Sequence, residues 1–397
     1  MAVRITTRGL FRNYSSNLTK NTNRLNSSME KVETQRKFNS YAEDPAAASR
    51  AFQLRRSYWR TGDQIDNSNY IISKFQTGWT AMDGIIEGNG TNDGGLNGIA
   101  EALQGLSDTT GSARKSLGQD MVEMAESVVR MMNVQYGDEF VFAGADGLNV
   151  PFSWSNDGTK LLYRGIDVDA MRPLTESEFN RFKGNYDDIP AFQEYLDDEG
   201  ISESSATFDD FKTWYQDEYQ VNYDEAAARF TESTYVDIGI GMKLNEDGEV
   251  IPTSAFNSSL NGMEYLGYGE DEDGDSRNLA VLLRELGNIF LDCDAESGAY
   301  ANVEDAERAR VLTLKLQGAM SGMIEQHSKL SASVDYLNTN VDQLTVNKDQ
   351  LNEQIMDLEE IDAADAITQM LWAQYSYNAA LRIGTNILSQ SLIDYMS

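Results

Sequence analysis

Apolar residues recur at steps of three and four near the N-terminus of this 397-residue chain. Side chains at such steps lie on one face of a helix, and their repetition every seven residues is the pattern of a coiled coil. The apolar positions are Phe11, Tyr14, Leu18, Leu25 and Val32, and the polar residues Asn21 and Ser28 occupy the two missing steps. The pattern therefore predicts a helix whose coiled-coil seam has two weak points.

A longer pattern of the same kind fills the C-terminal part of the chain. Its apolar positions are Val334, Leu337, Val341, Leu344, Leu351, Ile355 and Leu358, with Lys348 as the polar interruption, continued by Ile361, Ile367, Met370, Leu371, Tyr377, Leu381 and Leu388. This length exceeds that of a usual globular helix and is typical of a coiled coil. The two seams predict an antiparallel coiled coil of the two termini, with pairing between separate molecules as the alternative.

Proline positions set the limits of the predicted helices. Only five prolines occur, and residues 1–44, 46–150 and 253–397 contain none, so long helices are undisturbed there. Asp44 and Pro45 predict a turn followed by a helix start, because these residue types are favoured at those positions. We expect helices over about 46–86 and 96–136, the latter with a candidate break at 107–112. Helix should resume near Leu279 and continue to the end.

The middle of the chain changes to an alternating period with turn residues, which predicts β-hairpins over 139–143, 152–154 and 160–163. Residues 166–276 mix short helices, over 205–220 and 222–230, with a strand in 234–244. The predicted fold is mainly α with an α+β insert. A long antiparallel coiled-coil rod of both termini carries β-hairpins at its tip. The expected domains are 1–40 with 360–397, disordered in the monomer, then 41–165 with 277–359, and the acidic insert 166–276.

Charged residues are unevenly distributed along the chain, and their balance limits the kinds of partner that it can bind. The net charge is −32, with 13 Lys and Arg against 6 Asp and Glu in residues 1–80, and 6 against 28 in residues 166–275. This balance argues against nucleic-acid binding, which is built from Lys and Arg. We expect the acidic middle to be a solvated, repulsive surface. No stretch approaches the 18 apolar residues of a membrane span, and the N-terminus lacks the apolar segment of a secretory signal.

Candidate chemistry is sparse. Cys293 is the only cysteine and His327 the only histidine, which excludes a disulfide framework and limits metal or acid–base catalysis. The loop of residues 269–278 resembles a calcium loop in composition but lacks its ligand spacing. We therefore expect no catalytic residue, no metal site and no cofactor. A hydrolase activity carried by residues 166–275 is the enzymatic alternative.

Three stretches, in order along the chain, resemble the bacterial flagellin family. "FNSYAEDPAAASRA", Phe38 to Ala51, is similar to the family's N-terminal Asp-Asp-Pro turn, although Glu43 replaces the first aspartate. "EFVFAGADGLNVPFSW", Glu139 to Trp154, resembles a hairpin of the hook–filament junction type. "DAADAITQMLWAQYSYNAALRIGTNILSQSLIDYM", Asp362 to Met396, resembles the C-terminal helix of that type. The resemblance covers about residues 1–165 and 279–397.

Within the family, the tail "SLIDYMS" and the segment "SARKSLGQDMVEMAESVV" depart from filament-forming flagellins and favour the junction type. The resemblance implies an extracellular structural subunit of the flagellum, exported through the flagellar type III apparatus without a cleaved signal. It implies assembly with itself and with other axial proteins, namely a second junction protein and filament flagellin. It also implies an export chaperone at the C-terminal helix, no nucleic acid and no membrane insertion. A filament-forming flagellin is the alternative.

The expected subunit interface follows from the seams and the turn. Its residues are Phe11, Tyr14, Leu18, Leu25, Val32, Asp44, Pro45, Leu371, Tyr377, Leu381, Leu388, Leu392 and Tyr395. Because Asn21, Ser28 and Lys348 weaken the seams, we expect the terminal helices to fold when neighbouring subunits bury their apolar faces.

Overall fold

The computed structural model describes residues 7–87, 95–107, 113–156, 158–170, 174, 176, 179–180, 190–271, 273–294 and 296–396. It contains two compact units, Met1–Ile65 with Asp342–Ser397, and Asp66–Val341. Helices dominate both units, and the strands form small antiparallel sheets. The prediction of a mainly α fold with short β elements is confirmed.

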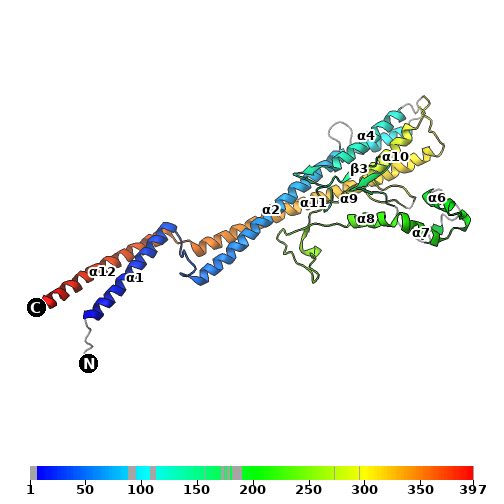
Figure 1. Cartoon of the computed structure of the whole chain (residues 1–397). Coiled ribbons are helices and arrows are strands. Elements are labelled where there is room, and N and C mark those ends of the chain that lie inside the picture. The colour runs from blue at the N-terminus through cyan, green and yellow to red at the C-terminus, as the bar shows by residue number, and fades with distance from the viewer. Residues whose placement is uncertain are drawn as a thin grey trace. The chain divides into compact units, whose positions relative to one another are not determined.

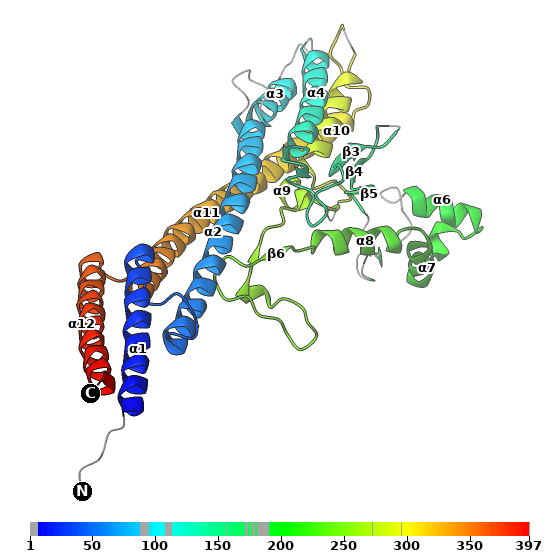
Figure 2. The same cartoon turned by 60° about the vertical axis from the view of Figure 1, so that its left-hand side comes forward.

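The first unit is built from helix pairs (Figures 1 and 2). Helix α1 (Thr7–Thr34) lies side by side with α12 (Ala363–Met396). Two more helices contribute part of their length to this unit. They are α2 (Pro45–Glu87), up to residue 65, and α11 (Asp305–Glu359), from residue 342. The two helices of the α1–α12 pair run antiparallel, since residues near the end of α1 bond to residues just before the start of α12.

The second unit has its core between helices and hairpins. Helices α3 (Gly95–Ser107), α4 (Arg114–Met132) and α10 (Leu279–Leu291) join residues 66–87 of α2 and 305–341 of α11. One side chain from each of four helices is fully buried there, namely Met82, Met121, Leu283 and Leu316. The short helix α9 (Gly262–Leu266) supplies the buried Met263 to the same core.

The small sheets lie against this core. Strands β1 (Gln135–Tyr136) and β2 (Glu139–Phe140) form one hairpin. Strands β3 (Phe152–Trp154), β4 (Leu161–Tyr163) and β5 (Ile166–Asp167) form a three-stranded meander, and β6 (Tyr235–Val236) pairs with β7 (Phe256–Asn257). Residue 166, where the sequence suggests that an insert begins, therefore lies inside a sheet that starts at residue 152.

The insert has a small core of its own. Helices α6 (Pro190–Asp198), α7 (Phe208–Glu218) and α8 (Gln220–Phe230) follow the meander, with 3-10 turns at Glu203–Ser205 and Pro252–Ser254. Its buried cluster is mostly aromatic and comprises Phe179, Phe192, Leu196, Ala206, Phe211, Trp214 and Tyr215. Thr207 caps α7 through a reciprocal hydrogen bond with Asp210, so short helices persist in this acidic segment.

Two predicted helices end earlier than expected. Of the helix expected over 96–136, α3 ends at Ser107 and α4 runs from Arg114 to Met132; apart from Ser107, the candidate break at 107–112 lies outside the described residues. Asn133 ends α4, because its amide donates to the carbonyl oxygen of Phe152 at 2.8 Å and accepts from the Phe152 N–H at 2.9 Å. The Asn133 side chain therefore bonds to the backbone of strand β3, and the helix does not continue for another turn.

The expectation of unbroken helix from Leu279 to the end is wrong. Helix α10 ends at Leu291, where Asp294 accepts backbone hydrogen bonds from Glu296 and Ser297 and forms a turn. Helix α11 ends at Glu359, and Asp362 caps the next helix by accepting from the Ala364 N–H at 2.7 Å. Side-chain acceptors that compete with the helical ladder explain both breaks.

Close contact between α4 and α10 depends on two facing glycines. A Cβ built on Gly118 would lie 2.6 Å from the carbonyl oxygen of Gly287 and 2.9 Å from the backbone nitrogen of Leu291. A Cβ on Gly287 would lie 2.9 Å from the Gly118 oxygen. These neighbours are backbone atoms, so no side-chain rotation can relieve the overlap.

We expect Gly118→Ala to destabilise the protein by roughly 1–3 kcal/mol, because it forces α4 and α10 apart. The matched control is Gly318→Ala in α11, where no described atom lies within 4 Å of the added Cβ; that change should stabilise by about 0.5–1 kcal/mol through helix propensity. Urea unfolding followed by tryptophan fluorescence measures both. Equal effects of the two changes would contradict this account of the crossing.

The carboxyl groups of Asp169 and Glu270 are poorly solvated. Burial raises the pKa of Asp169 to about 7, against a hydrogen bond of 2.6 Å from the Ser276 hydroxyl that acts to lower it. Burial, with the nearby Asp167 carboxylate, likewise raises the pKa of Glu270 to about 7. Both folded-state values lie above the ordinary value near 4 of an unfolded chain.

An acid with a raised pKa holds its proton more tightly when folded, so the free energy of unfolding should increase as pH falls from 8 through 7 toward 5. Asp169→Asn cannot titrate and keeps an acceptor for Ser276. We expect this variant to show a shallower dependence of the urea midpoint on pH between 8 and 5. The same slope in the variant and the wild type would contradict the assignment.

Candidate assembly surface

The inward face of α1 carries the seam predicted from the sequence. Tyr14, Leu18, Leu25 and Val32 are half-buried, and the polar Asn21 and Ser28 occupy the same face. Ser28 is buried, and its hydroxyl donates to the Arg24 carbonyl oxygen at 2.8 Å, which satisfies it within the helix. The register of this helix is therefore as predicted, whereas Phe11, at its outer end, is 53% exposed.

The inward face of α12 consists mainly of small residues. Its least exposed positions, again at steps of four and three, are Ala366, Met370, Ala373, Tyr377, Ala380 and Gly384. Small side chains let two helices approach closely. At Gly384 an added Cβ would overlap the phenol of Tyr14, so the tyrosine of α1 occupies the space that the glycine leaves.

The large apolar side chains of α12 point elsewhere and are exposed. They are Ile367 (45% exposed), Leu371 (44%), Trp372 (69%), Tyr375 (70%), Leu381 (39%) and Ile383 (55%). So many large exposed apolar side chains on one helix favour a binding role. We call these six residues the outer α12 face.

A joint of irregular backbone connects α1 to α2 beside the break between α11 and α12. The Lys37 N–H donates to the Glu359 carbonyl oxygen at 2.6 Å, and the Ile361 N–H donates to the Gln35 oxygen at 3.0 Å. These bonds form a short antiparallel bridge where both helices of the pair stop. Gln35 adopts a φ of 55°, a left-handed conformation that ends a helix sharply.

Glu359 is the electrostatic centre of this joint. Its side chain is 9% exposed and forms ion pairs with the guanidinium groups of Arg36, at 3.4 Å, and Arg55. One arginine follows α1 and the other belongs to α2, so a single carboxylate holds three segments together. A nearly buried carboxylate with two cationic partners is stabilising only while both partners remain.

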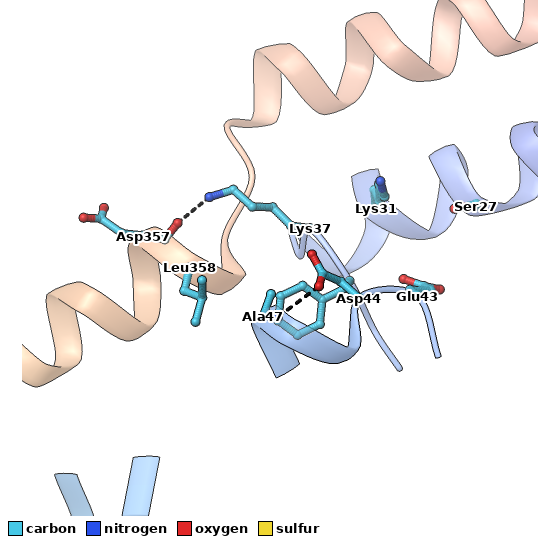
Figure 3. A pocket seen from close by; sticks show the side chains of 9 residues that line it. Ser27, Lys31, Lys37, Glu43, Asp44, Ala47, Asp357 and Leu358 are labelled. Carbon is cyan, nitrogen blue, oxygen red and sulfur yellow. Dashed lines mark hydrogen bonds between the residues drawn. The ribbon is translucent and has the colours of Figure 1, made fainter. Parts of the chain in front are cut away.

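The start of α2 lies beside this joint (Figure 3). Asp44 caps the helix by accepting from the Ala47 N–H at 2.9 Å, and Pro45 is its first residue. Lys37 donates to the carbonyl oxygen of Asp357 across the same region. A hollow of about 530 Å³, lined in part by Lys31 and Lys37, lies there. The sequence prediction of a turn and helix start at Asp44 and Pro45 is thus seen in the structure.

The predicted interface residues fall into four groups. Tyr14, Leu18, Leu25, Val32 and Tyr377 lie on the α1–α12 seam, and Asp44 with Pro45 starts α2. Phe11, Leu371 and Leu381 are exposed. The side chains of Leu388, Leu392 and Tyr395 lie outside the described residues, although their backbone is helical.

Sequence reasoning missed the small residues of the α12 seam and the role of Glu359. Ala366, Ala373 and Ala380 recur every seven residues, which is a usable signal, but alanine is neutral in a pattern that counts large apolar residues. Glu359 carries no local signal, since its partners are more than 300 positions away.

Elsewhere the acidic loop near residue 273 is held by cations of the same chain. The Lys315 ammonium lies 2.6 Å from Asp271 and 3.1 Å from Asp273, and it also bonds Asp275. Asp275 is buried and pairs with Arg308 as well. The loop is thus an ion-paired attachment to α11, which corrects the expectation of a wholly solvated acidic surface.

The remaining candidates for chemistry have packing roles. His327 stacks on Trp79 with ring centroids 4.7 Å apart. Cys293 is buried, and its thiol donates to the Ile289 carbonyl oxygen at 3.4 Å. None of the described helices is long and apolar enough to cross a membrane.

Comparison with known proteins gives the following. Residues 5–146 match the family model of the bacterial flagellin N-terminal helical region. A search of curated proteins finds no match to the sequence. A solved structure described as that of a putative flagellar hook-associated protein from Vibrio parahaemolyticus is similar, with a TM-score of 0.49 and 11% identity, over 80% of this chain and 100% of that chain.

The structure is that of a helical protein whose terminal helices pair and whose α12 exposes large apolar side chains. Its residues 5–146 are similar to the N-terminal helical region of the bacterial flagellins, a class of structural proteins.

We expect Glu359→Ala to loosen the joint, because two arginines lose their shared carboxylate. Since both guanidinium groups are partly exposed, the loss should be only about 1 kcal/mol, or roughly fivefold faster exchange of the Lys37 amide proton. Hydrogen exchange followed by mass spectrometry measures this. The control is Glu360→Ala, an exposed neighbour; equal exchange in the two variants would contradict the role of Glu359.

Proposed function

We propose that this chain is the adaptor at the hook–filament junction of the bacterial flagellum. The observation that carries the proposal is the division of α12 into a small inward face and a large apolar outer face. Subunits that repeat around an axis need a surface of this kind, because each copy must bury apolar area against neighbours. The resemblance of the last residues, Ser391 to Met396, to the junction type selects this subunit among axial proteins.

The energetics favour assembly that completes the folding of the termini. Apolar burial contributes roughly 25 cal/mol per Å², so an Ala- and Gly-rich seam stabilises the α1–α12 pair only weakly. Asn21 and Ser28, which lie in the same seam on α1, weaken it further. The outer α12 face, with the exposed Trp372 and Tyr375, offers apolar surface to neighbouring subunits. The terminal helices are therefore ordered mainly by neighbours, and the interface offsets the entropy that ordering costs.

This mechanism also suits export. A chain with weakly held ends and no disulfide can be threaded unfolded through the type III apparatus without a cleaved signal. While its partners are absent, a chaperone at the C-terminal helix covers the outer α12 face. The proposed partners after export are copies of the chain, a second junction protein and filament flagellin, and its location is the extracellular flagellum.

A filament-forming flagellin is the second candidate, since the flagellin N-terminal match applies equally to it. The two candidates differ in self-assembly. An adaptor stays unpolymerised when the purified protein is seeded with filament fragments, whereas a filament subunit extends them into long filaments.

A strain lacking this gene should build hooks without filaments and release flagellin monomers into the medium. The reason is that, without the adaptor, exported flagellin subunits have no surface at the end of the hook on which to begin polymerising. Electron microscopy of the cells, with immunoblotting of the medium, measures both effects. Return of the intact gene is the control and should restore filaments; intact filaments in the deletion strain would refute the proposal.

A further inference from the structure

Residues 45–65 of α2 and 342–359 of α11 pack against each other in the first unit. Arg55 bonds Glu359 at one end of the contact. Further along, the Lys348 ammonium lies 5.1 Å from the centre of the Tyr58 ring. Positions that step by three and four from these residues, Leu54 on α2 and Leu351 on α11, are half-buried. The contact is therefore an antiparallel two-helix seam whose inward positions are known.

The face of α2 turned away from this seam is aromatic and basic. Phe52, Arg56 and Trp59 recur at steps of four and three, and each is exposed between inward positions such as Ala51, Leu54 and Tyr58. Phe52 is 70% exposed and Trp59 69% exposed. Among the residues that the structure describes, none forms an ion pair with Arg56 or with the neighbouring Arg50. We call Phe52, Arg56 and Trp59 the α2 stripe.

The outward face of α11 is aliphatic and acidic. Val346, Asp349, Glu353 and Met356 recur at steps of three, four and three, again between inward positions. Val346 is 56% exposed and Met356 43% exposed. Within the described part of the chain, the carboxylates of Asp349 and Glu353 have no cationic partner. We call these four residues the α11 stripe.

The two stripes lie on different exposed faces of the helix pair, because one belongs to α2, the other to α11, and neither contains an inward position. Residues 45–65 contain four arginines and one aspartate, whereas residues 342–359 contain five carboxylates and one lysine. One face of the pair is thus aromatic and basic, and another is aliphatic and acidic. Two such pairs placed side by side in the same orientation bring unlike charges together.

Resting on the proposed function as an assembling flagellar subunit, we propose that copies of this chain pack laterally, the α2 stripe of one copy against the α11 stripe of the next. The exposed rings of Phe52 and Trp59 cover Val346 and Met356 of the neighbour, and Arg56 pairs with Asp349 or Glu353. A two-fold contact of like stripes would place arginine on arginine or carboxylate on carboxylate, which is unfavourable.

A contact between different faces of identical subunits is heterologous, so it repeats until it closes into a ring or continues as a helix. Charge complementarity also fixes the direction in which the contact repeats, because the basic α2 stripe of each copy contacts the acidic α11 stripe of the next copy. High salt should weaken the contact, because the charges on both stripes are exposed.

The first test detects the contact itself in the full-length protein. Arg56→Lys keeps the charge and supplies an amine that a zero-length carbodiimide links to a carboxylate in contact. An equal mixture of ¹⁴N- and ¹⁵N-labelled protein at high concentration should give mixed-isotope peptides that join the substituted position to Asp349 or Glu353, and 1 M salt should reduce them. Failure to find mixed-isotope links at either carboxylate overturns the proposal.

The second test uses charge reversal in the deletion strain. Arg56→Glu alone and Glu353→Arg alone should each reduce the number of filamented cells at least about tenfold, because like charges then face each other. The double variant in one chain should restore filaments, as should co-expression of the two single variants. The matched control is Arg310→Glu, an exposed arginine of α11 in the second unit, which should act as the wild type.

The outcomes separate this proposal from the proposed function. Single variants that complement fully, or a double variant no better than the single ones, overturn the lateral contact while the deletion phenotype still supports the junction role. The latter result would indicate another axial protein as the occupant of the stripes. Mixed-isotope links in a protein whose deletion leaves filaments intact would instead support the contact and refute the junction role.

Discussion

The pairing of α1 and α12 depends on a seam between the large side chains of α1 and the small ones of α12. Alanines at 366, 373 and 380 and Gly384 let the helices approach closely, yet each small side chain contributes little free energy. The large side chains of α12 are therefore left for contacts outside the chain. A seam of leucines would make a stable monomer with no apolar surface to offer. The small inward residues of α12 thus explain both the weak contact with α1 and the large side chains that remain exposed for contacts outside the chain.

Specific polar and backbone contacts stabilise other parts of each unit. At the joint, Glu359 holds Arg36 and Arg55 at the point where α1, α2 and α11 come together, while Asp44 sets the first turn of α2. In the second unit, Gly118 and Gly287 bring α4 and α10 into backbone contact, and the buried Asp275 attaches the acidic loop to α11 through Arg308 and Lys315. These contacts are specific ion pairs, caps and close backbone approaches, whereas the α1–α12 pair has small residues along one side of its seam.

The sequence predicted the inward face of α11 well because its inward positions are large and apolar. Leu337 and Leu344 of α11 are buried at the steps expected for them. In α12 a count of large apolar residues passes over the small inward ones, since Ala373 and Ala380 are buried while Leu371 and Leu381 are exposed. Large apolar residues occur on more than one face of α12. Periodicity alone cannot tell which of two such faces meets the partner helix, because that choice depends on the distance between the helices.

By itself the sequence determined the helical class, the turn at Asp44 and Pro45, the hairpins near β3 and β4, the flagellin character of the chain and its scarcity of chemical groups. These follow from local periodicity, capping and composition, which act over a few residues. The tertiary structure decided the phase of α12, the breaks after Leu291 and Glu359, the joint at Glu359 and the pairing of Lys315 with three aspartates. Each of these depends on residues far apart in sequence, whose approach is set by packing that no local pattern contains.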